Sequence, residues 1–415
     1  MPRVLLVAAT TGYQTRVFAD AARRLGYDLI LATDRCHVLE DPCGDRAIPV
    51  RFEDPDGARD VLAANGPFDA IIPVADRPTL LAALAAEALH VPHNPPASVI
   101  ACHDKFLARQ LFKAARLPVP EFFRVSLDEG PRAAADKATY PCVLKPLGLS
   151  ASRGVIRANN VVEFVAAFER IKTILGGVDI LMLGEEHNRY IQFETYIEGR
   201  EFALEGLLTG GKLHVFAIFD KPDPLEGPFF EETTYVTPSR EGKETEQALI
   251  AATQTAVRAL GLVRGPIHAE MRLNSHGVWM LEVAARPIGG LCARALRFND
   301  GISLEELILR HAVGEDVSAV RLDGPSTGVM MIPIPNGGVY QGVQGVETAS
   351  AVPDIEQVII TAKEGQKILP LPEGASYLGF IFARGASAHL VEQALRKAHA
   401  CLEFDIATAL PVMKR

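Results

Sequence analysis

The sequence predicts a mixed α/β and α+β protein that begins with a small doubly wound domain. Three observations support this. Short apolar runs alternate with helical patterns near the N-terminus, as in parallel βαβ units. Two β-hairpins follow, at residues 201–220 and 266–290. The chain has 415 residues, which is enough for two or three domains.

The apolar runs near the N-terminus predict a parallel sheet. Three apolar runs have the composition of buried parallel strands, at residues 3–9, 28–34 and 68–74. The loop after the first run lacks the GxGxxG spacing of a dinucleotide site. Because ligands bind at strand ends in such sheets, we expect a substrate contact near Thr11 or Asp76. Asp104 is predicted to cap a helix that begins at Lys105.

A second α/β unit follows residues 117–122, whose prolines end that helix. Its predicted elements are a strand, a Gly/Ser loop, a helix and a further strand, at residues 139–146, 147–155, 161–175 and 190–198. Lys145 ends the first strand beside the small residues of the loop. An ammonium group and accessible backbone N–H groups suit a phosphate, although this is not a Walker A motif. The alternative is a lysine whose stem packs on apolar surface while its amine reaches solvent.

The remaining chain predicts antiparallel structure. The first hairpin turns at Gly210-Gly211, and the following residues 222–239 form a long loop whose size suggests a function. Further elements are predicted as a helix, a β-rich segment, a strand and a helix, at residues 244–260, 326–370, 377–385 and 387–402.

The second hairpin brings two carboxylates together. Residues 267–274 alternate polar and apolar side chains, and Ser275-His276-Gly277 fits a three-residue turn. Counting from this turn predicts four cross-strand pairs: Asn274 with Val278, Arg272 with Met280, Glu270 with Glu282, and His268 with Ala284. Like charges at a cross-strand pair destabilise a sheet, and a cation between them removes this cost.

A divalent cation is therefore one explanation for the Glu270–Glu282 pair. Hard carboxylate oxygens suit Mg²⁺ or Mn²⁺. Arg286 lies four residues beyond Glu282 on the same face, where its guanidinium can bind a phosphate or an acyl anion. The alternative is an exposed hairpin whose two glutamates face water.

Composition narrows the classes of partner. The chain is 48% hydrophobic and 22% charged, with a formal net charge of −9 and a mean hydropathy of +0.13. This is a soluble globular composition without a basic block, so neither nucleic acid nor an anionic membrane is an expected partner. No apolar run reaches the length of a membrane span, and the N-terminus reads as a strand.

The six cysteines form no CxxC pair, which predicts reduced thiols and a cytoplasmic location. Cys36, His37 and Cys43 have poor spacing for a metal site and lack a fourth ligand. We therefore expect no zinc centre from them.

Several motifs in this order resemble those of the ATP-grasp superfamily across the whole chain. They are Lys105, VLKP with Lys145, the loop 148–154, ETYIEGRE at 194–201, HAEMRL at 268–273 and LEVAARPIGG at 281–290. Within the superfamily the chain is most similar to carboxylate–amine ligases of the L-amino-acid ligase type. That closer similarity rests on residues 220–239 and on LGFIFARG at 378–385.

The resemblance implies an ATP-grasp fold of three parts. These are an N-terminal α/β domain (1–119), a small α+β lid (120–199) and a large antiparallel domain (200–415) whose C-terminal α+β part covers about 316–415. ATP would lie between the lid and the large domain. Dimerisation is common for this fold, so a homodimer is possible.

The resemblance also implies a role for each matching residue. Nucleotide contacts would come from Lys105, Lys145, Ser150, Ser152 and Gly154 at the phosphates, from Glu194, Tyr196 and Ile197 at adenine, and from Glu201 at the ribose. Glu270 and Glu282 would hold Mg²⁺ or Mn²⁺. Arg286 would bind the reacting phosphate or carboxylate, which places it with Glu282 and His268 in the catalytic group.

One position departs from the superfamily pattern. Many ATP-grasp enzymes carry Asn two residues after the second metal carboxylate, where this chain has Ala284. We hypothesise that His268, opposite Ala284, covers part of that role or contacts the substrate. The alternative is a structural histidine hydrogen-bonded within the hairpin. Equal metal dependence and substrate KM in a His268→Ala variant would exclude the first hypothesis.

The implied activity is ATP-dependent formation of an amide or peptide bond through an acylphosphate, with release of ADP and phosphate. The substrates would be a small carboxylate and an amine, and amino acids are expected. An alternative is an ATP-grasp carboxylase or a purine-biosynthesis type of ligase that uses bicarbonate or a phosphorylated amine. The loops at 10–16 and 76–79 offer few cations for such a phosphate. A nucleotide-binding module without catalysis is the third hypothesis, against which the intact Glu270, Glu282 and Arg286 argue.

Overall fold

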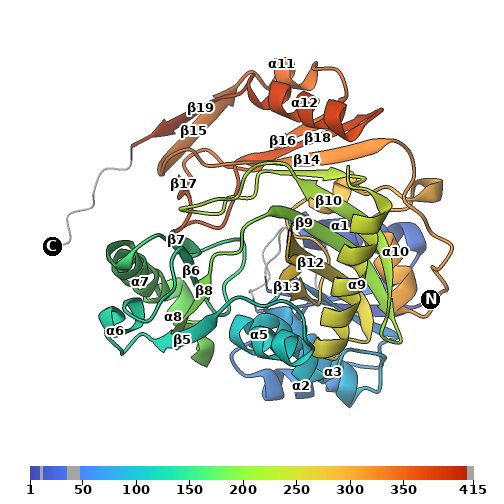
Figure 1. Ribbon diagram of the computed structural model, residues 1–415. Helices are drawn as coiled ribbons and strands as arrows, with labels where there is room; N and C mark the ends of the chain where they lie inside the picture. Colours follow the sequence, from blue (N-terminus) through green and yellow to red (C-terminus); the bar gives the residue numbers. More distant parts are fainter. Residues whose placement is uncertain (10–12, 35–46, 409–415) are drawn as a thin grey trace. The chain divides into compact units, whose positions relative to one another are not determined.

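The computed structural model describes residues 1–9, 13–34 and 47–408 (Figure 1). These residues form two compact units. Unit 1 comprises residues 1–119, 203–218 and 242–324, and unit 2 comprises residues 120–202, 219–241 and 325–415. Strands β9 (Arg200–Thr209) and β10 (Lys212–Lys221) contribute residues to both units. The division into three domains stays a prediction.

The N-terminal sheet of unit 1 is parallel, as predicted. Its order is β3-β2-β1-β4, with β1 Arg3–Ala8, β2 Asp28–Thr33, β3 Ile48–Pro49 and β4 Ala70–Val74. Helix α1 (Tyr13–Leu25) connects β1 to β2, α2 (Pro55–Ala64) connects β3 to β4, and α3 (Pro78–Ala88) follows β4. Apolar residues of β1, β2 and β4 pack with α2 and α3 into one core, in which Leu5, Val7 and Leu62 are fully buried.

Unit 1 also contains the antiparallel order β13-β12-β9-β10. Its further elements are α4 Pro96–His103, α5 Lys105–Ala114, α9 Lys243–Leu260, β12 Arg264–Asn274, β13 Gly277–Ala284, η3 Cys292–Ala295, η4 Asn299–Gly301 and α10 Leu304–Ala312. Asp104 caps α5, as predicted, because its carboxylate accepts hydrogen bonds from the backbone N–H groups of Phe106 and Leu107. This cap fixes the start of the helix that carries Lys105.

The hairpin of β12 and β13 confirms two predicted pairs and corrects two others. Glu270 pairs with Glu282, and His268 pairs with Ala284, as predicted. Asn274 pairs with Gly277 and Arg272 with Trp279, so the predicted partners Val278 and Met280 are wrong. The turn holds two residues and not three, and a β-bulge next to Glu270 adds one residue to β13. The two differences cancel from Glu270 onward, which is why the carboxylate pair was predicted correctly.

His311, near the end of α10, gives a pH-dependent contribution to stability. Its Nε2 lies 2.9 Å from the Thr209 hydroxyl, and the side chain is buried. Burial, with the charge of Arg264, lowers the pKa of His311 from 6.5 to about 4. The unfolded chain therefore takes up a proton near pH 6.5 that the folded protein binds only near pH 4, so stability falls as the pH falls through this interval.

From this shift we expect the free energy of unfolding to drop by about 2 kcal/mol between pH 7 and pH 5. Denaturant titration of the parent and of His311→Gln measures the drop, because glutamine keeps a polar side chain that does not titrate in this range. The difference in the free energy of unfolding between the parent and His311→Gln should become smaller as the pH falls. Parallel pH profiles in the two proteins would contradict the assignment.

Unit 2 contains a four-stranded antiparallel sheet in the order β5-β8-β6-β7. Its elements are β5 Phe122–Ser126, α6 Pro131–Ala135, β6 Cys142–Pro146, β7 Ile156–Ala158, α7 Val161–Leu175, α8 Val178–Leu181, η2 Glu186–Arg189 and β8 Tyr190–Thr195. The buried face of α7 packs on this sheet through Phe164, Phe168 and Ile171, together with Leu144 and Phe193 of the strands. The strands, the loop and the helix all occur where the sequence predicts them.

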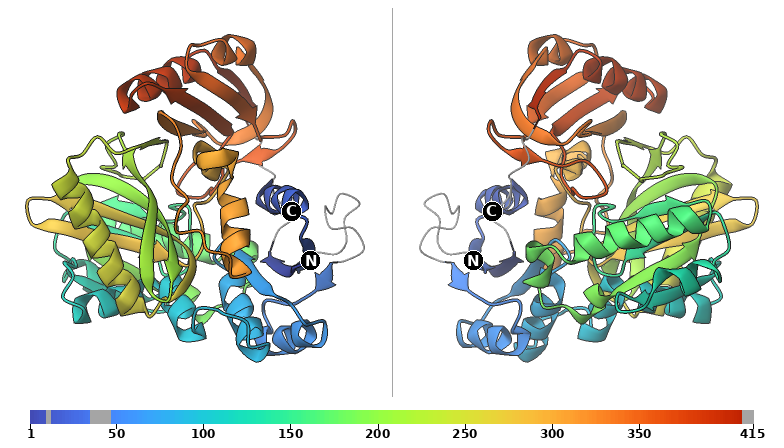
Figure 2. Two further views of the ribbon diagram at one scale, coloured as in Figure 1. Left: turned by 90° about the vertical axis from the view of Figure 1, so that its right-hand side faces the viewer. Right: turned by 90° about the vertical axis from the view of Figure 1, so that its left-hand side faces the viewer.

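The rest of unit 2 is also antiparallel, with the order β11-β14-β18-β16 and a small sheet β17-β15-β19. The elements are β11 Thr234–Thr237, β14 Ser326–Ile332, β15 Gly338–Gln344, α11 Val346–Ser350, β16 Ile355–Ile360, β17 Lys367–Ile368, β18 Gly379–Gly385, α12 Ala388–His399 and β19 Glu403–Ala407. Helix α12 lies along β14 and β18 (Figures 1 and 2). The prediction that residues 222–239 form one loop is wrong for Thr234–Thr237, because β11 pairs with β14 and, at Val236, with Asp220 of β10.

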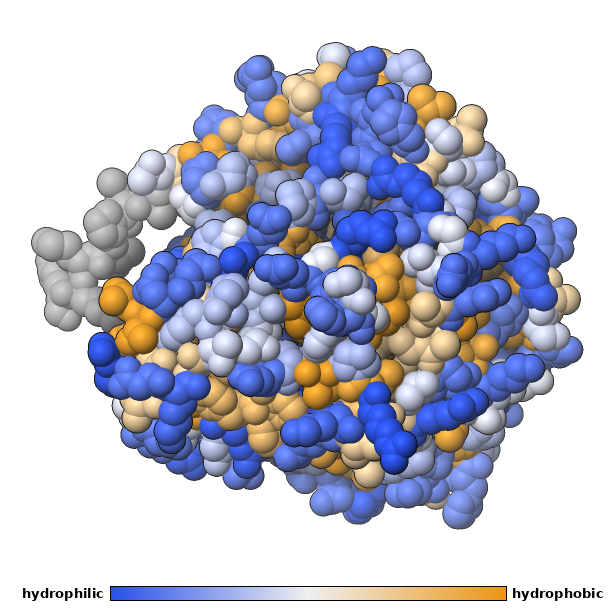
Figure 3. Space-filling view, in the orientation of Figure 1, coloured by the Kyte–Doolittle hydropathy of each residue, from blue (hydrophilic) through white to orange (hydrophobic). Residues whose placement is uncertain are grey.

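Hydrophilic residues dominate the face shown in Figure 3, with smaller hydrophobic areas between them. Among the described residues, no helix combines the length and the apolar character that crossing a bilayer requires.

Candidate active site

Lys145 is a buried, paired lysine, which excludes the alternative of an amine in solvent. Its Nζ lies 2.5 Å from Oε2 of Glu194, and both side chains are at most 10% exposed. The pairing follows from the register, in which Lys145 of β6 lies opposite Gln192 of β8, and Glu194 is the next residue on the same face. Gln192 donates from Nε2 to the other Glu194 oxygen at 2.6 Å. Burying an ammonium group and a carboxylate together is costly, which is typical of a binding site.

Glu201 belongs to a second buried charge cluster in unit 2. Lys221 Nζ lies 2.9 Å from Glu201 Oε1 and 2.5 Å from Glu232 Oε1, and the Lys221 side chain is 3% exposed. Tyr235 donates from its hydroxyl to Glu232 at 2.8 Å, and its ring lies under the Lys221 ammonium. The sequence analysis missed Lys221 and Glu232. The sequence does carry a signal for this cluster, because Lys221 ends an apolar strand and Glu231 and Glu232 follow in the next segment.

The loop between β6 and β7 holds an unusual backbone conformation. Ala151 and Ser152 both have φ of 54°, in the left-handed region that costs about 1 kcal/mol or more for a residue with a side chain. Gly154 follows with φ of 73°, and its N–H donates to Pro372 O at 2.9 Å. Such strain is found where a loop is shaped for a ligand. Ser150, Ser152 and Gly154 therefore lie in one ordered turn.

Tyr196 and Ile197 follow β8, and Tyr196 borders an apolar cluster. Tyr196 packs with Val143, Leu225 and Phe230, and its backbone N–H donates to Pro141 O at 2.9 Å. Its ring also stacks near Phe230, and its hydroxyl donates to Leu225 O at 3.2 Å. An apolar wall beside backbone polar groups is the environment in which a flat heteroaromatic ring binds.

The two glutamates of the second hairpin each have a cation beside them in unit 1. Lys105 Nζ lies 3.5 Å from Glu282 Oε2, and His268 Nε2 lies 3.1 Å from Glu270 Oε1. The side chains of Glu270 and Glu282 are 21% and 27% exposed, so neither is fully in water. Mg²⁺ is a hard cation that binds one or two carboxylates and keeps other coordination positions open. Two paired and partly exposed carboxylates fit this preference. The fold does not require a bound ion, because Lys105 and His268 already offset the negative charges of Glu282 and Glu270.

His268 joins Glu270 to a buried carboxylate that the sequence analysis missed. Its Nδ1 lies 2.6 Å from Glu205 Oε1, on β9, and Glu205 is 1% exposed. Burial disfavours the charged imidazole, but hydrogen bonds to Glu205 and Glu270 and their charges outweigh this and raise the pKa of His268 to about 9. Burial likewise raises the pKa of Glu205, against the hydrogen bond with His268. Both ring nitrogens of His268 are therefore protonated at neutral pH, and the imidazolium fixes the orientation of Glu270. Whether it also contacts the substrate stays a hypothesis.

Arg286 is held by a two-point ion pair with Asp76. Its Nε and Nη2 donate to the two Asp76 oxygens at 2.8 and 3.0 Å, and Nη1 donates to Pro287 O at 3.0 Å. Burial opposes both charges, but the pair lowers the pKa of Asp76 and raises that of Arg286. Asp76 follows β4, so this strand end orients Arg286. The substrate contact expected there stays a prediction. Thr11, the other residue expected there, lies outside the described residues, as do Cys36, His37 and Cys43.

Cys102 lies in the same unit and does not supply a reactive thiolate. Burial, reinforced by the negative charges of Glu282 and Asp76, raises the pKa of this thiol well above its usual range. A neutral thiol is a poor nucleophile. The chemistry that the cluster supports is therefore charge stabilisation by Lys105, Arg286 and the carboxylates.

Three family profiles match the chain. The ATP-grasp N-terminal domain matches residues 19–93, the ATP-grasp domain matches residues 138–295, and the L-amino acid ligase C-terminal domain 2 matches residues 330–407. The profile of residues 138–295 covers Lys145, Glu201, Glu270, Glu282 and Arg286, whereas Lys105 lies between two profiles.

Similar proteins agree with these profiles. The crystal structure of L-amino acid ligase from Bacillus licheniformis aligns with a TM-score of 0.80 at 26% identity, covering 98% of this chain and 99% of that one. An uncharacterized protein y4rH of Sinorhizobium fredii is 22% identical over 98% of this chain and 84% of its own. The alanine–anticapsin ligase of Bacillus subtilis is 26% identical over 50% of this chain and 46% of its own. The alignment thus spans about half the length of that ligase.

Proposed function

Because this chain belongs to the ATP-grasp superfamily, as an ATP-dependent carboxylate–amine ligase of the L-amino-acid ligase type, we propose that it joins two amino acids into a dipeptide. The observation that carries the proposal is the Glu270–Glu282 pair with Lys105, His268 and Arg286 in the same unit. This arrangement can hold a phosphoryl group and a carboxylate, and the reaction needs no serine or cysteine nucleophile. A homodimer and a cytoplasmic location also stay predictions.

We assign the nucleotide contacts to the residues of unit 2. Lys145 neutralises ATP phosphates, and the strained turn offers the hydroxyls and backbone N–H groups of Ser150 and Ser152 to their oxygens. Gly154 closes this turn through its hydrogen bond to Pro372 O. Adenine packs against the apolar cluster at Tyr196 and Ile197. The Glu194 carboxylate orients Lys145, and Glu201 accepts hydrogen bonds from the ribose hydroxyls, as carboxylates do in other nucleotide sites.

We assign phosphoryl transfer to unit 1. Glu270 and Glu282 would hold Mg²⁺, which would offset the charge of the phosphoryl oxygens when bound. Lys105 adds an ammonium group beside Glu282. A guanidinium has five N–H groups, and Asp76 and Pro287 accept hydrogen bonds from three of those of Arg286. The other N–H groups of Arg286 can donate to a substrate. A fixed guanidinium of this kind orients a planar carboxylate and stabilises charge in the transition state.

The reaction then follows in two steps. The carboxylate of the first amino acid attacks the γ-phosphorus of ATP, the bond to the β-phosphate oxygen breaks, and an acylphosphate and ADP form. The amine of the second amino acid attacks the acyl carbon, phosphate leaves, and the amine loses a proton. Excluding water protects the acylphosphate between the steps.

The test is phosphate release from ATP with amino acids supplied singly and in pairs, with mass spectrometry of the products. We expect release of ADP and phosphate, and a dipeptide, only with particular pairs. Release that requires bicarbonate and no second amino acid would instead support the carboxylase alternative. Binding of ATP without turnover across the panel would overturn the ligase proposal.

Lys221→Met is expected to weaken ATP binding about tenfold or more, with a smaller effect on kcat. The substitution leaves Glu201 and Glu232 together without their shared cation, so Glu201 either moves or takes up a proton. Titration with ATP and with 2′-deoxy-ATP measures this, because the loss should be larger for the nucleotide with both hydroxyls. Tyr235→Phe, which keeps the ring under Lys221 but removes one hydrogen bond to Glu232, is the milder comparison. Equal losses for both nucleotides would contradict the ribose assignment of Glu201.

A further inference from the structure

Gly148, at the start of the loop after β6, lies against the ring of His187. A Cβ atom added to Gly148 would be 2.0 Å from Nε2 and 2.4 Å from Cδ2 of that ring. Gly148 does not have the positive φ that would itself require glycine. The missing side chain at this position is therefore explained by the imidazole and not by the backbone conformation.

The strand order brings these two residues together. Strands β6 and β8 are antiparallel neighbours, and Pro146 at the end of β6 pairs with Ile191 near the start of β8. The loop that leaves β6 therefore lies beside η2, the short helix that leads into β8. The packing is local to unit 2 and follows from the five residue pairs between β6 and β8.

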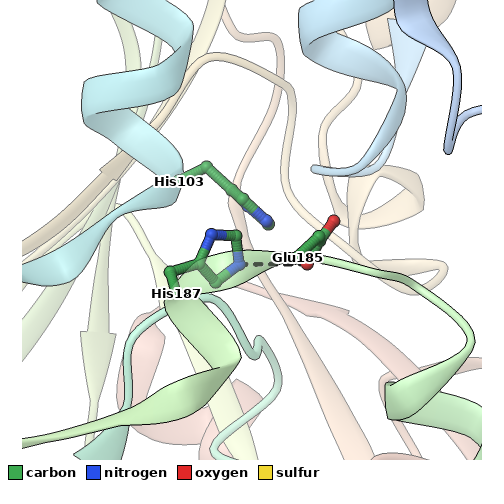
Figure 4. A group of neighbouring side chains, drawn as sticks. All are labelled: His103, Glu185 and His187. Atoms are coloured by element: carbon green, nitrogen blue, oxygen red, sulfur yellow. Dashed lines mark ion pairs between the residues drawn. The ribbon is translucent and has the colours of Figure 1, made fainter. Parts of the chain in front are cut away.

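Glu185 holds the His187 ring in this place. His187 Nε2 lies 3.0 Å from Glu185 Oε2, an ion pair drawn as a dashed line in Figure 4. The Asn188 side-chain amide donates to the same oxygen at 3.4 Å. The side chains of His187 and Glu185 are both only about one-fifth exposed, so the ring has little freedom to rotate away.

The other end of the same loop is also anchored. Arg153 donates from Nε to Glu373 O at 3.0 Å and from Nη1 to Asp179 at 2.7 Å, and the Gly154 N–H donates to Pro372 O. Between the two anchors lie Ala151 and Ser152, in their strained left-handed conformation. A strained conformation persists only where its surroundings hold it at both ends. At the first end Leu147 is fully buried and Leu149 packs on the core of unit 2, and the ring of His187 lies against Gly148 between them.

We propose that His187, oriented by Glu185, is a positioning residue that sets the conformation of the loop 147–154 and thereby the affinity for ATP phosphates. The inference rests on the proposed nucleotide role of this loop. It adds a requirement outside the loop itself, namely the contact between an imidazole and a glycine. His187 acts through the loop and is not expected to touch the reacting atoms.

The test is a double-mutant cycle of His187→Ala and Gly148→Ala, read by ATP titration and by kcat. We expect each single variant to weaken ATP binding about tenfold, since small misplacements of binding groups have effects of this size, with kcat changed less. The Gly148→Ala methyl group displaces the ring that His187→Ala removes. The double variant should therefore bind ATP no more weakly than His187→Ala alone.

Two further variants separate positioning from general damage. His187→Gln keeps an N–H donor for Glu185 and should recover most of the ATP affinity that His187→Ala loses. Gly130→Ala is the matched control, because an added Cβ there meets no atom within 4 Å and its φ is −73°, so affinity should be unchanged. Melting temperatures show which variants are folded.

The possible outcomes decide between the inference and the proposed function. Additive losses in the double variant, or parental ATP affinity in folded His187→Ala, would overturn the role of His187. A parent protein that binds ATP but forms no dipeptide would instead overturn the ligase proposal, and the cycle would still report on the loop. Non-additive losses with recovery in His187→Gln support the inference.

Discussion

Glu282→Gln is expected to reduce ligase turnover by about a hundredfold or more while the protein stays folded. Glutamine keeps the shape of the side chain but lacks the charge that a divalent cation requires. The fold should not suffer, since Glu282 lies opposite Glu270 and removing one of two like charges relieves their repulsion. Loss of the contact with Lys105, at 3.5 Å and partly exposed, should cost at most about 1 kcal/mol.

A direct metal-binding readout accompanies the kinetic one. The chain has a single tryptophan, Trp279, which lies on β13 three residues before Glu282. Its fluorescence should respond to Mg²⁺ or Mn²⁺ in the parent and only at much higher concentration in Glu282→Gln. Glu244→Gln, on the exposed first turn of α9, is the control and should behave as the parent does. Parental turnover of Glu282→Gln at low Mg²⁺ would refute the metal assignment.

The hairpin of β12 and β13 shows which features of the structure the sequence alone can predict. Alternation in residues 267–274 established which side chains share a face, and counting placed Glu270 opposite Glu282. The length of the turn and the bulge next to Glu270 were not predicted, because both depend on local backbone choices that several sequences satisfy equally. The Glu270–Glu282 pair was predicted correctly because the two errors compensate, so the pairing was less secure than the counting suggested.

The partners of the site residues were harder to predict than the residues themselves. Lys145 and Glu194 occur in motifs, but their ion pair depends on the register of β6 and β8, which single-strand patterns do not define. Glu205, Lys221 and Asp76 come from other strands and loops, so no spacing along the chain connects them with His268, Glu201 or Arg286. Long-range pairing of this kind is a property of the folded sheet. The sequence could name candidate ligands, but not the residues that contact and orient them.

Asp76 and Arg286 give the second large expected effect, on stability as well as activity. Arg286→Met should destabilise the protein by about 3–5 kcal/mol, because it leaves the Asp76 carboxylate buried without its partner. Arg23→Met, which breaks an exposed pair with Asp20, should cost less than about 1 kcal/mol and serves as the control. Denaturant titration measures both.

The double variant Arg286→Met/Asp76→Asn separates the structural role of the pair from its chemical role. Neutralising Asp76 removes the unpaired buried charge, so most of the lost stability should return. Turnover should not return, because the guanidinium that orients the carboxylate and stabilises the transferred phosphoryl group is still missing. Asp76→Asn alone keeps that guanidinium but loosens its orientation, and should lower kcat by an intermediate amount. Recovery of turnover together with stability in the double variant would show that Arg286 serves the fold of unit 1 and not the reaction.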